Sequence, residues 1–314
     1  MRARALGAAL VLATSVAQAQ SPQTLEWLRK MHQATQRLSY VGLFVYQQGD
    51  RTESSRITRY AAGDIEKLEV MNGVQREIVR TRDEVRCYLP DSRVVKVDRR
   101  VDRDFPGLLP EQISALAQHY DISLGETQRI AGLECQTVVL QPRDNLRYGY
   151  RLYADVRSGM LMRADTVDAA GQSVETLMFT QFTPRSVTRD MVRPSHEGRN
   201  WRIEDAGAAP VRLAGWGLAA ELPGFHKVIE LKRRLGESRS AGQMVFSDGL
   251  AAVSVFIEPL ESRRERSATG LASMGAIHIY TREVANHMIT VVGEAPAVSV
   301  QRIADAVEFH RPPQ

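Results

Sequence analysis

Long hydrophobic runs are missing from this sequence, and none approaches the roughly 20 residues that a membrane-spanning helix needs. The apolar segment near the start covers only Ala5–Ala13 and follows the basic residues Arg2 and Arg4. Ala17-Gln18-Ala19 then supplies the small-x-small pattern of a secretory signal peptide, so residues 1–19 are expected to be removed by cleavage near Ala19. No cysteine follows that site to carry a lipid anchor. We therefore expect a soluble exported chain, which in a Gram-negative cell resides in the periplasm.

Cysteine is scarce, with two residues in a chain of 314, Cys87 and Cys135. In an oxidising compartment two unpaired thiols are less favoured than one disulfide. A bridge also requires Cα atoms within roughly 7 Å, which the sequence does not reveal. A Cys87–Cys135 disulfide and two buried inert thiols therefore both remain open.

A strong charge of either sign is absent. The formal net charge is +4, and removing the two arginines of the signal peptide leaves +2. A chain this balanced is not expected to bind nucleic acid. Lysine is rare, with five residues, so arginine supplies most of the positive charge. Arginine favours fixed contacts with carboxylates and phosphates, which leaves local surfaces for acidic partners or anionic lipid.

Signatures of catalysis and of metal binding are also absent. The seven histidines are scattered, without an HExxH motif or a pair four residues apart. The GxGxxA string at Gly215–Ala220 is followed too closely by Pro223-Gly224 for the helix that a dinucleotide site needs. We predict no catalytic residue, no metal and no cofactor. The sequence favours a binding protein over an enzyme.

What is present is ordinary globular material, 43% hydrophobic and 25% charged, in a length typical of two domains. Ser21-Pro22 predicts a helix start, and apolar residues recur on one face of a helix over residues 23–38. A second helix is expected at 110–120. Strand-like runs fill most of the remainder: 40–46, 56–60, 65–71, 75–80, 84–89, 94–98, 127–129, 137–141, 148–153, 161–167 and 175–182.

Short spacing between these strands predicts an antiparallel meander rather than a parallel sheet with crossover helices. The expected fold class is α+β, with a large curved antiparallel half-barrel sheet covered by helices over residues 20–195. Residues 196–212 read as a linker rich in proline, glycine and charge. Residues 213–314 predict a smaller antiparallel-sheet domain that closes with a helix at 298–309.

Several strings are too particular to be generic. In the first half they are Trp27-Leu28-x-x-Met31, Tyr40-x-Gly42-x-Phe44-Val45-Tyr46, Arg76-Glu77, Cys87-Tyr88-Leu89-Pro90, Arg147-Tyr148-Gly149-Tyr150-x-Leu152, Asp155 with Gly159, and Glu175–Phe179. In the second half they are Leu222-Pro223-Gly224-Phe225, Ser247–Glu258, and Val292-Gly293-Glu294-Ala295-Pro296. Together they resemble the sigma-E factor regulatory proteins of the MucB/RseB family over nearly the whole mature chain.

The resemblance implies a first domain similar to LolA-type lipoprotein carriers, with a lipid-accepting concavity. It also implies a periplasmic negative regulator that binds the periplasmic segment of a membrane-spanning anti-sigma factor and shields it from regulated proteolysis. Lipid or lipopolysaccharide would release that segment. The sequence leaves a homo-oligomer open. An alternative function is a periplasmic lipoprotein or lipid carrier, and a hydrolase with an unrecognised site is a third.

Three sets of candidate site residues follow, each with a structural alternative. The lipid cavity, or else a dry core, is expected to involve Trp27, Leu28, Met31, Phe44, Tyr46, Met71, Leu108, Leu109, Tyr148, Leu152, Met178 and Phe179. The partner site, or else in part a tight turn between strands, is expected at Ser247, Asp248, Gly249, Leu250, Glu258, Gly293 and Glu294. Anionic headgroups would meet Arg59, Arg76, Arg80, Arg82 and Arg86, which otherwise form a solvated sheet face.

Overall fold

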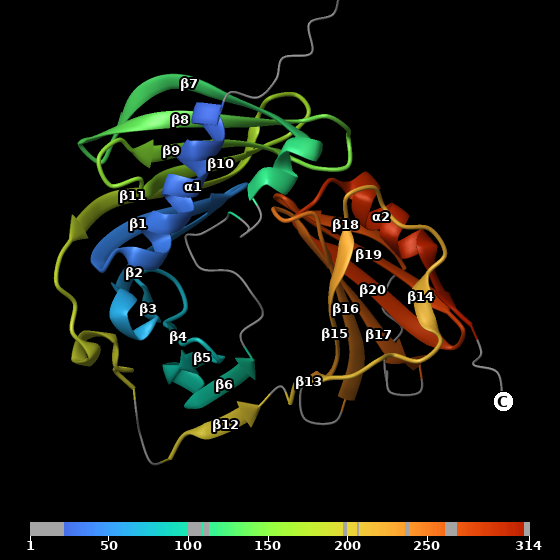
Figure 1. Ribbon diagram of the computed structural model, residues 1–314. Helices are drawn as coiled ribbons and strands as arrows, with labels where there is room; N and C mark the ends of the chain where they lie inside the picture. Colours follow the sequence, from blue (N-terminus) through green and yellow to red (C-terminus); the bar gives the residue numbers. More distant parts are fainter. Residues whose placement is uncertain are drawn as a thin grey trace, which may run out of the picture.

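The computed structural model describes residues 22–99, 109, 113–196, 200–205, 207–235, 239–260 and 269–310. The predicted signal peptide lies outside the described residues. Two antiparallel sheets, each with its own helical cover, make up the two parts of the molecule (Figure 1). This confirms the expected α+β class, with a large curved sheet followed by a smaller one that carries a C-terminal helix.

The first sheet has twelve strands in the order β12-β6-β5-β4-β3-β2-β1-β11-β10-β9-β8-β7. All neighbours pair antiparallel except β12 and β6, which run parallel. The strands are β1 (Tyr40–Gln48), β2 (Arg51–Tyr60), β3 (Ile65–Val70), β4 (Glu77–Arg80), β5 (Glu84–Leu89), β6 (Val94–Arg99), β7 (Tyr120–Ile130), β8 (Leu133–Pro142), β9 (Gly149–Asp155), β10 (Leu161–Val167), β11 (Ser173–Pro184) and β12 (Arg202–Asp205).

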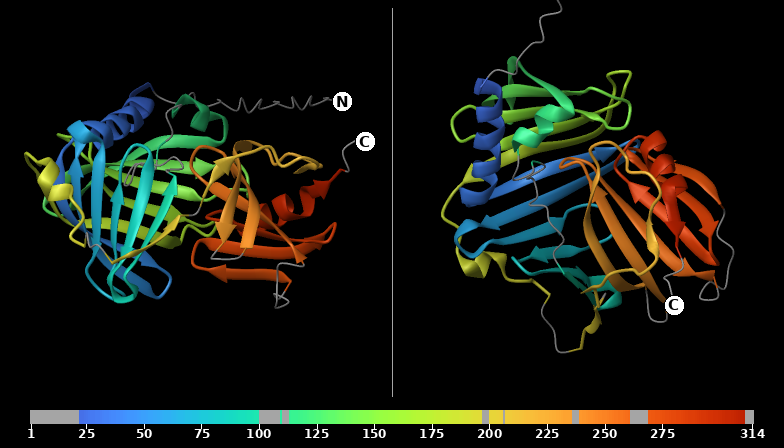
Figure 2. Two further views of the ribbon diagram at one scale, coloured as in Figure 1. Left: turned by 90° about the horizontal axis from the view of Figure 1, so that it is seen from below. Right: turned by 45° about the vertical axis from the view of Figure 1, so that its right-hand side comes forward.

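Helix α1 (Pro22–Arg37) lies against one side of this curved sheet (Figure 2). Its apolar face buries Leu28 and Met31 against strands β8 to β10, as the helical spacing predicts. The helix is fixed at the β9–β10 turn, where Lys30 Nζ donates to the carbonyl oxygen of Val156 at 2.6 Å. Gly159 lies under the helix with φ +77, and a Cβ there would stand 2.6 Å from Lys30 Cγ. The turn glycine therefore allows the helix to approach the sheet.

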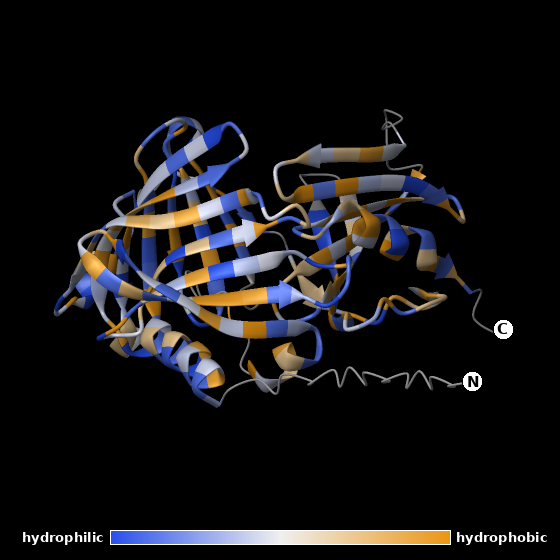
Figure 3. Ribbon diagram, turned by 90° about the horizontal axis from the view of Figure 1, so that it is seen from above, coloured by the Kyte–Doolittle hydropathy of each residue, from blue (hydrophilic) through white to orange (hydrophobic). Residues whose placement is uncertain are grey.

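The second sheet has seven strands in the order β13-β15-β16-β17-β20-β19-β18, and helix α2 (Ala297–Ala306) packs on β19 and β20. Its strands are β13 (Ala209–Pro210), β15 (His226–Leu235), β16 (Arg239–Ser247), β17 (Ala252–Pro259), β18 (Gly270–Met274), β19 (Ile277–Val284) and β20 (His287–Gly293). A small third sheet pairs β14 (Trp216–Leu218) with β21 (Val307–Phe309). Along the strands of both large sheets, hydrophilic and hydrophobic residues alternate (Figure 3).

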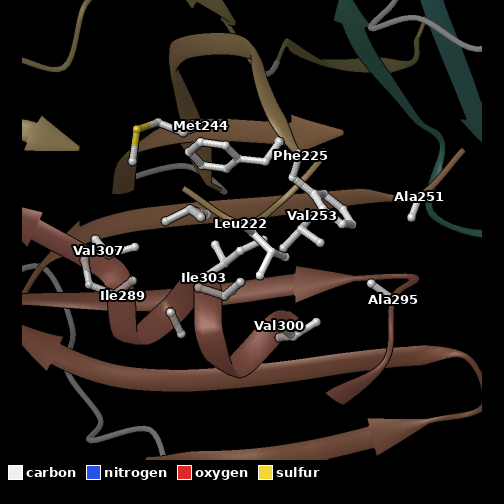
Figure 4. Close-up of a cluster of buried hydrophobic side chains, with 14 of the residues drawn as sticks. Leu222, Phe225, Met244, Ala251, Val253, Ile289, Ala295, Val300, Ile303 and Val307 are labelled. Atoms are coloured by element: carbon white, nitrogen blue, oxygen red, sulfur yellow. The ribbon is translucent and has the colours of Figure 1, made fainter. Parts of the chain in front are cut away.

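The core of the second domain lies between its sheet and α2. Leu222 and Phe225 pack beside Val253, with Val300 and Ile303 of α2 facing them (Figure 4). All five side chains are buried. The Leu222–Phe225 string closes a turn through the hydrogen bond from Phe225 N–H to the carbonyl oxygen of Leu222 at 2.9 Å. This Leu-Pro-to-Phe turn brings its two apolar residues into the core.

Three details differ from the sequence predictions. Within the expected helix at 110–120, the described part is a 3-10 helix, η3 (Ile113–Gln118), and Tyr120 already begins β7 with its side chain buried. The expected closing helix stops at Ala306, because residues 307–309 turn extended to pair with β14. The predicted linker contains β12 and β13, which each add a short strand to one sheet.

The disulfide considered between Cys87 and Cys135 is not formed, and both thiols are free. Cys87 lies on β5 and Cys135 on β8, and seven strands separate these two in the first sheet. Burial raises the pKa of both thiols, that of Cys135 to about 11. Both cysteines are therefore poor nucleophiles near neutral pH.

Two searches cover the described residues alone. None of their helices has the length and apolar character needed to cross a membrane. No group of three or more histidine, cysteine, aspartate or glutamate side chains among them is arranged to hold a metal ion.

Candidate functional site at the domain junction

The two domains meet around a buried ion pair. Arg147, in the loop before β9, donates from Nε to Oδ2 of Asp248 in the β16–β17 turn at 3.0 Å. Both side chains are fully buried. Tyr120 Oη donates to the same aspartate oxygen at 3.3 Å. Burial raises the pKa of Tyr120 well above its usual value, so the hydroxyl remains a donor.

Arg147 also contacts the Leu-Pro-to-Phe turn of the second domain. Its Nη2 donates to the carbonyl oxygen of Pro223 at 2.6 Å, and its guanidinium lies 5.4 Å from the ring centre of Phe225. Gly224 has φ +79, and a Cβ there would stand 2.8 Å from Nη2 of Arg147. Only glycine fits this turn without displacing the arginine. The remaining guanidinium nitrogen, Nη1, pairs with Asp144 at 2.8 Å within the first domain.

The β16–β17 turn presents Asp248 through its own hydrogen bonds. Asp248 Oδ1 accepts the backbone N–H groups of Leu250 and Ala251 at 2.9 and 2.7 Å, and Ser247 Oγ accepts that of Gly249 at 3.0 Å. Gly249 has φ +99. The turn expected from the sequence, with serine and aspartate capping the backbone, is confirmed. Oδ1 serves the turn, and Oδ2 faces the first domain.

Each domain also inserts one leucine into the other. Leu146, from the first domain, is buried in the core of the second together with Phe225 and Val300. Leu250, from the second domain, is buried in the α1 cluster of the first. Ser299 Oγ of α2 reinforces the first insertion by donating to the carbonyl oxygen of Leu146 at 2.5 Å. The junction is therefore a reciprocal exchange of apolar side chains around a buried charge pair.

A second contact lies where the β18–β19 turn touches the ends of β1 and β9. Tyr148 Oη donates to the carbonyl oxygen of Ala276 at 3.4 Å. Gly275 faces Gln48, and a Cβ at this glycine would stand 2.3 Å from Gln48 Cγ. Tyr148 is thus a junction residue rather than a lining residue of the first domain.

Two carboxylates, those of Glu175 and Glu294, lie near each other across this second contact. Glu175 on β11 accepts the hydroxyl of Tyr46 and lies near Glu294, which follows β20. Burial, together with the negative charge of Glu294, raises the pKa of Glu175 to about 7. The hydrogen bond from Tyr46 opposes this shift. Glu175 therefore holds its proton to a higher pH than an ordinary glutamate does.

The lipid-cavity candidates divide between two apolar clusters of the first domain. Trp27, Leu28, Met31, Leu109 and Leu152 lie in or against the cluster under α1. Phe44, Tyr46, Met178 and Phe179 lie in or against the next cluster along the sheet. Met71 lies apart from both, half exposed, at a cavity of about 480 Å³ that Arg76 also lines. Leu108 lies outside the described residues.

The arginine candidates are paired with carboxylates. Arg59 is buried between Asp64 and Glu66. Of the others, Arg76 pairs with Glu53, Arg80 with Glu66, Arg82 with Asp64 and Arg86 with Glu84. Arg82 is the most exposed of the five, at 83% of its side chain, and its partner oxygen is 4.0 Å away. Each of these arginines is therefore largely neutralised by a nearby carboxylate. Arg86 lies on the opposite face of the sheet from Arg59 and Arg80, so the five do not form one surface.

The partner-site candidates lie mostly at the junction rather than on an open surface. Asp248 and Leu250 are buried there, and Ser247 and Gly249 are half-buried beside them. Glu258 and Gly293 are buried within the second sheet, where a Cβ at Gly293 would stand 2.7 Å from Val253. Glu294 is exposed. Arg147 is not among the site residues predicted from the sequence, although it belongs to the string Arg147–Leu152 that supports the family resemblance.

Three of the strings quoted from the sequence meet here, because the segments that contain Pro223 and Asp248 both contact the guanidinium of Arg147. Two mainly antiparallel sheets that meet at a buried junction define a two-domain protein of the α+β class.

Comparison with known proteins shows the family to which this chain belongs. The model of the MucB/RseB N-terminal domain matches residues 23–196, and that of the MucB/RseB C-terminal domain matches residues 211–308. The chain belongs to the MucB/RseB family, which consists of regulatory proteins rather than enzymes. The resemblance inferred from the sequence is confirmed.

Individual relatives agree with the family match. The sigma factor AlgU regulatory protein MucB of Pseudomonas aeruginosa is 27% identical over 293 residues, covering 91% of this chain and 90% of the relative. The sigma-E factor regulatory protein RseB of Escherichia coli K12 is 28% identical over 301 residues, covering 92% of each. The crystal structure of MucB in complex with MucA(peri) shares the fold, with a TM-score of 0.70 at 24% identity over 92% of this chain and 99% of that one.

Proposed function

We propose that this protein is a periplasmic negative regulator of an envelope-stress sigma factor. It binds the periplasmic segment of a membrane-spanning anti-sigma factor and shields it from regulated proteolysis. The supporting observation is that both family domains are matched in order along the chain and meet at a junction to which three of its family-like strings contribute. Relatives are named sigma factor regulatory proteins, and a solved relative is MucB in complex with MucA(peri).

Covering a segment requires no catalytic residue. A protease binds its substrate as an extended backbone, so a protein that occupies the same backbone blocks cleavage by occupancy alone. Protection then scales with the fraction of the segment that is bound. A rigid junction favours such binding, because less conformational freedom is lost when the partner docks.

We further propose that a lipid or lipopolysaccharide acyl chain is the releasing signal and enters the first domain under α1. Leu28 and Met31 of the helix and Leu152 of the sheet offer a continuous apolar environment there. Leu250 of the second domain packs into the same cluster, so an acyl chain that entered the cluster would compete with the leucine that joins the domains. Lipid can shift the domain arrangement only as far as it binds one arrangement more tightly.

A binding titration tests the proposed function. The purified mature chain should bind the purified periplasmic domain of its anti-sigma factor, and micelles or vesicles containing lipopolysaccharide should lower the bound fraction. A chain that ends before residue 210 should lose partner binding yet retain binding of a fluorescent fatty acid. Partner binding at full strength by that truncated chain would contradict the role of the second domain. Absence of any binding by the full chain would contradict the proposed function itself.

A further inference from the structure

The two large sheets have four edge strands, and three of them carry features that hinder pairing with another chain. β12 has four residues, of which Arg202, Glu204 and Asp205 are charged. β7 has a register shift between Leu124 and Thr127. β13 has two residues, and one of them is Pro210. Charge, irregularity, shortness and proline are the usual protections of a sheet edge.

The fourth edge, β18, has none of these protections. Its sequence is Gly-Leu-Ala-Ser-Met, without charge or proline, and it pairs with β19 in unbroken register from Gly270 to Met274. All five residues are exposed, with Leu271 at 48% and Met274 at 41%. Among the described residues, no strand pairs with its outer side. An edge of this kind offers a row of main-chain donors and acceptors to an incoming strand.

We propose that the outer edge of β18 receives an extended segment of a partner polypeptide, which pairs with it as an eighth strand of the second sheet. The inference rests on the proposed function, in which that partner is the periplasmic segment of the anti-sigma factor. Gly270, Ala272 and Ser273 are small, so an incoming backbone can approach closely. Leu271 and Met274 point to opposite faces of the sheet, where each can contact alternate side chains of the segment.

The position of β18 favours a regulated partner over a second copy of this chain. The turn that joins β18 to β19 rests on the first domain, through Gly275 against Gln48 and Ala276 under Tyr148. A change in the domain arrangement would therefore move the end of the binding edge. This links the edge to the junction at which the releasing ligand is proposed to act.

Amide hydrogen exchange and partner titration test the inference in the mature full-length chain. Addition of the anti-sigma periplasmic domain should slow exchange at residues 270–274. Met274 and Ile277 flank a two-residue turn, so alternation along the hairpin directs the N–H of Ser273 to the outer side of β18. Ser273→Pro removes that outward main-chain donor and should weaken partner binding about tenfold or more. The double variant Leu271→Lys with Met274→Lys alters only exposed side chains and should weaken binding similarly. Val228→Lys, at a 58% exposed position of β15, is the matched control and should bind within about twofold of the unchanged chain.

The outcomes separate the inference from the proposed function. Unchanged exchange at residues 270–274 and unchanged affinity of the β18 variants, while the partner still binds, would overturn the edge assignment and leave the proposed function standing. Protection of these residues without partner, rising with protein concentration alongside a doubled mass, would assign the edge to self-pairing and also overturn it. Failure of the unchanged chain to bind the partner would contradict the proposed function.

Discussion

Arg147 and Asp248 are 101 positions apart in the sequence, yet Nε of the arginine lies 3.0 Å from Oδ2 of the aspartate with both side chains fully buried. Charges are seldom buried to this extent without a partner, because each loses several kcal/mol of hydration. Here the pair comes from different domains, so Asp248 of the second domain adds its charge to that of Asp144, which pairs with Arg147 within the first domain. Separation of the domains would expose or unpair both charges.

Removing one member of this pair should destabilise the chain strongly. Asp248→Asn removes one of the two carboxylates that pair with the buried Arg147 and leaves Asp144 as the other. We expect a loss of about 2–3 kcal/mol in the free energy of unfolding, measured with urea. Glu204→Gln is the matched control, because its ion pair with Arg202 is exposed and should contribute less than about 1 kcal/mol. A loss below about 1 kcal/mol for Asp248→Asn would contradict the importance of the junction.

The exchange of leucines makes a second prediction. Leu250→Ala removes a second-domain side chain from the core of the first domain, so we expect a loss of about 2–5 kcal/mol and a first-domain melting transition at lower temperature. Val228→Ala, at an exposed position, should change the free energy of unfolding by less than about 0.5 kcal/mol. Calorimetry of both variants decides the point. An unchanged first-domain transition in Leu250→Ala would show that the two cores are independent.

Glu175 predicts a dependence of stability on pH. Because its pKa rises from 4.5 to about 7 on folding, the folded chain holds this proton more tightly than the unfolded chain. Its contribution to stability is therefore fully present below about pH 4.5 and is lost as the pH rises to about 7. Glu175→Gln should remove this part of the pH dependence, as measured by urea unfolding between pH 4 and pH 8.

Glu294 should act on the same titration. Its negative charge helps to raise the pKa of Glu175, so Glu294→Gln should lower the Glu175 pKa followed by carboxyl NMR. Asp50→Asn, on the β1–β2 turn, serves as a control for a general change in net charge. If the pKa of Glu175 is the same in the Glu294→Gln variant as in the unchanged chain, the two carboxylates do not interact, and the contact across the junction would be contradicted.

The free thiols make a further prediction. Two cysteines should react with a thiol reagent in the unfolded chain, whether or not the protein was exposed to a reductant beforehand. In the folded chain Cys87 should react faster than Cys135, since Cys135 is fully buried and its pKa is raised to about 11. Mass spectrometry after timed labelling measures both rates. Recovery of an intact Cys87–Cys135 disulfide would contradict the arrangement of the first sheet.

Local patterns in the sequence account for much of this fold. The apolar spacing at Leu28 and Met31 predicts α1, and Ser247 to Gly249 predict a capped turn with a glycine of positive φ. Each depends on residues close together in the chain. The 3-10 helix at Ile113–Gln118 was harder to predict, because Tyr120 belongs to the neighbouring strand and the apolar residues before it suit either helix type.

The junction could not be predicted from the same patterns. The turn explains Oδ1 of Asp248 completely, and nothing local indicates that Oδ2 meets Arg147 of another domain. Leu250 likewise resembles an ordinary residue of its own sheet, although it packs under α1. The available signal was indirect. Arg147, Pro223 and Asp248 each lie in a string that resembles the family, and strings far apart in the sequence can be retained together because they contact one another in space.

Protection of the partner from proteolysis is the most direct measure of the central claim, that this protein acts by covering a segment rather than by chemistry. The anti-sigma periplasmic domain is incubated with its site-1 protease and increasing amounts of the mature chain, and the cleavage rate is followed by gel or mass spectrometry. The rate should fall in proportion to the bound fraction and recover when lipopolysaccharide is added. A cleavage rate that stays constant as the partner becomes saturated would contradict the account.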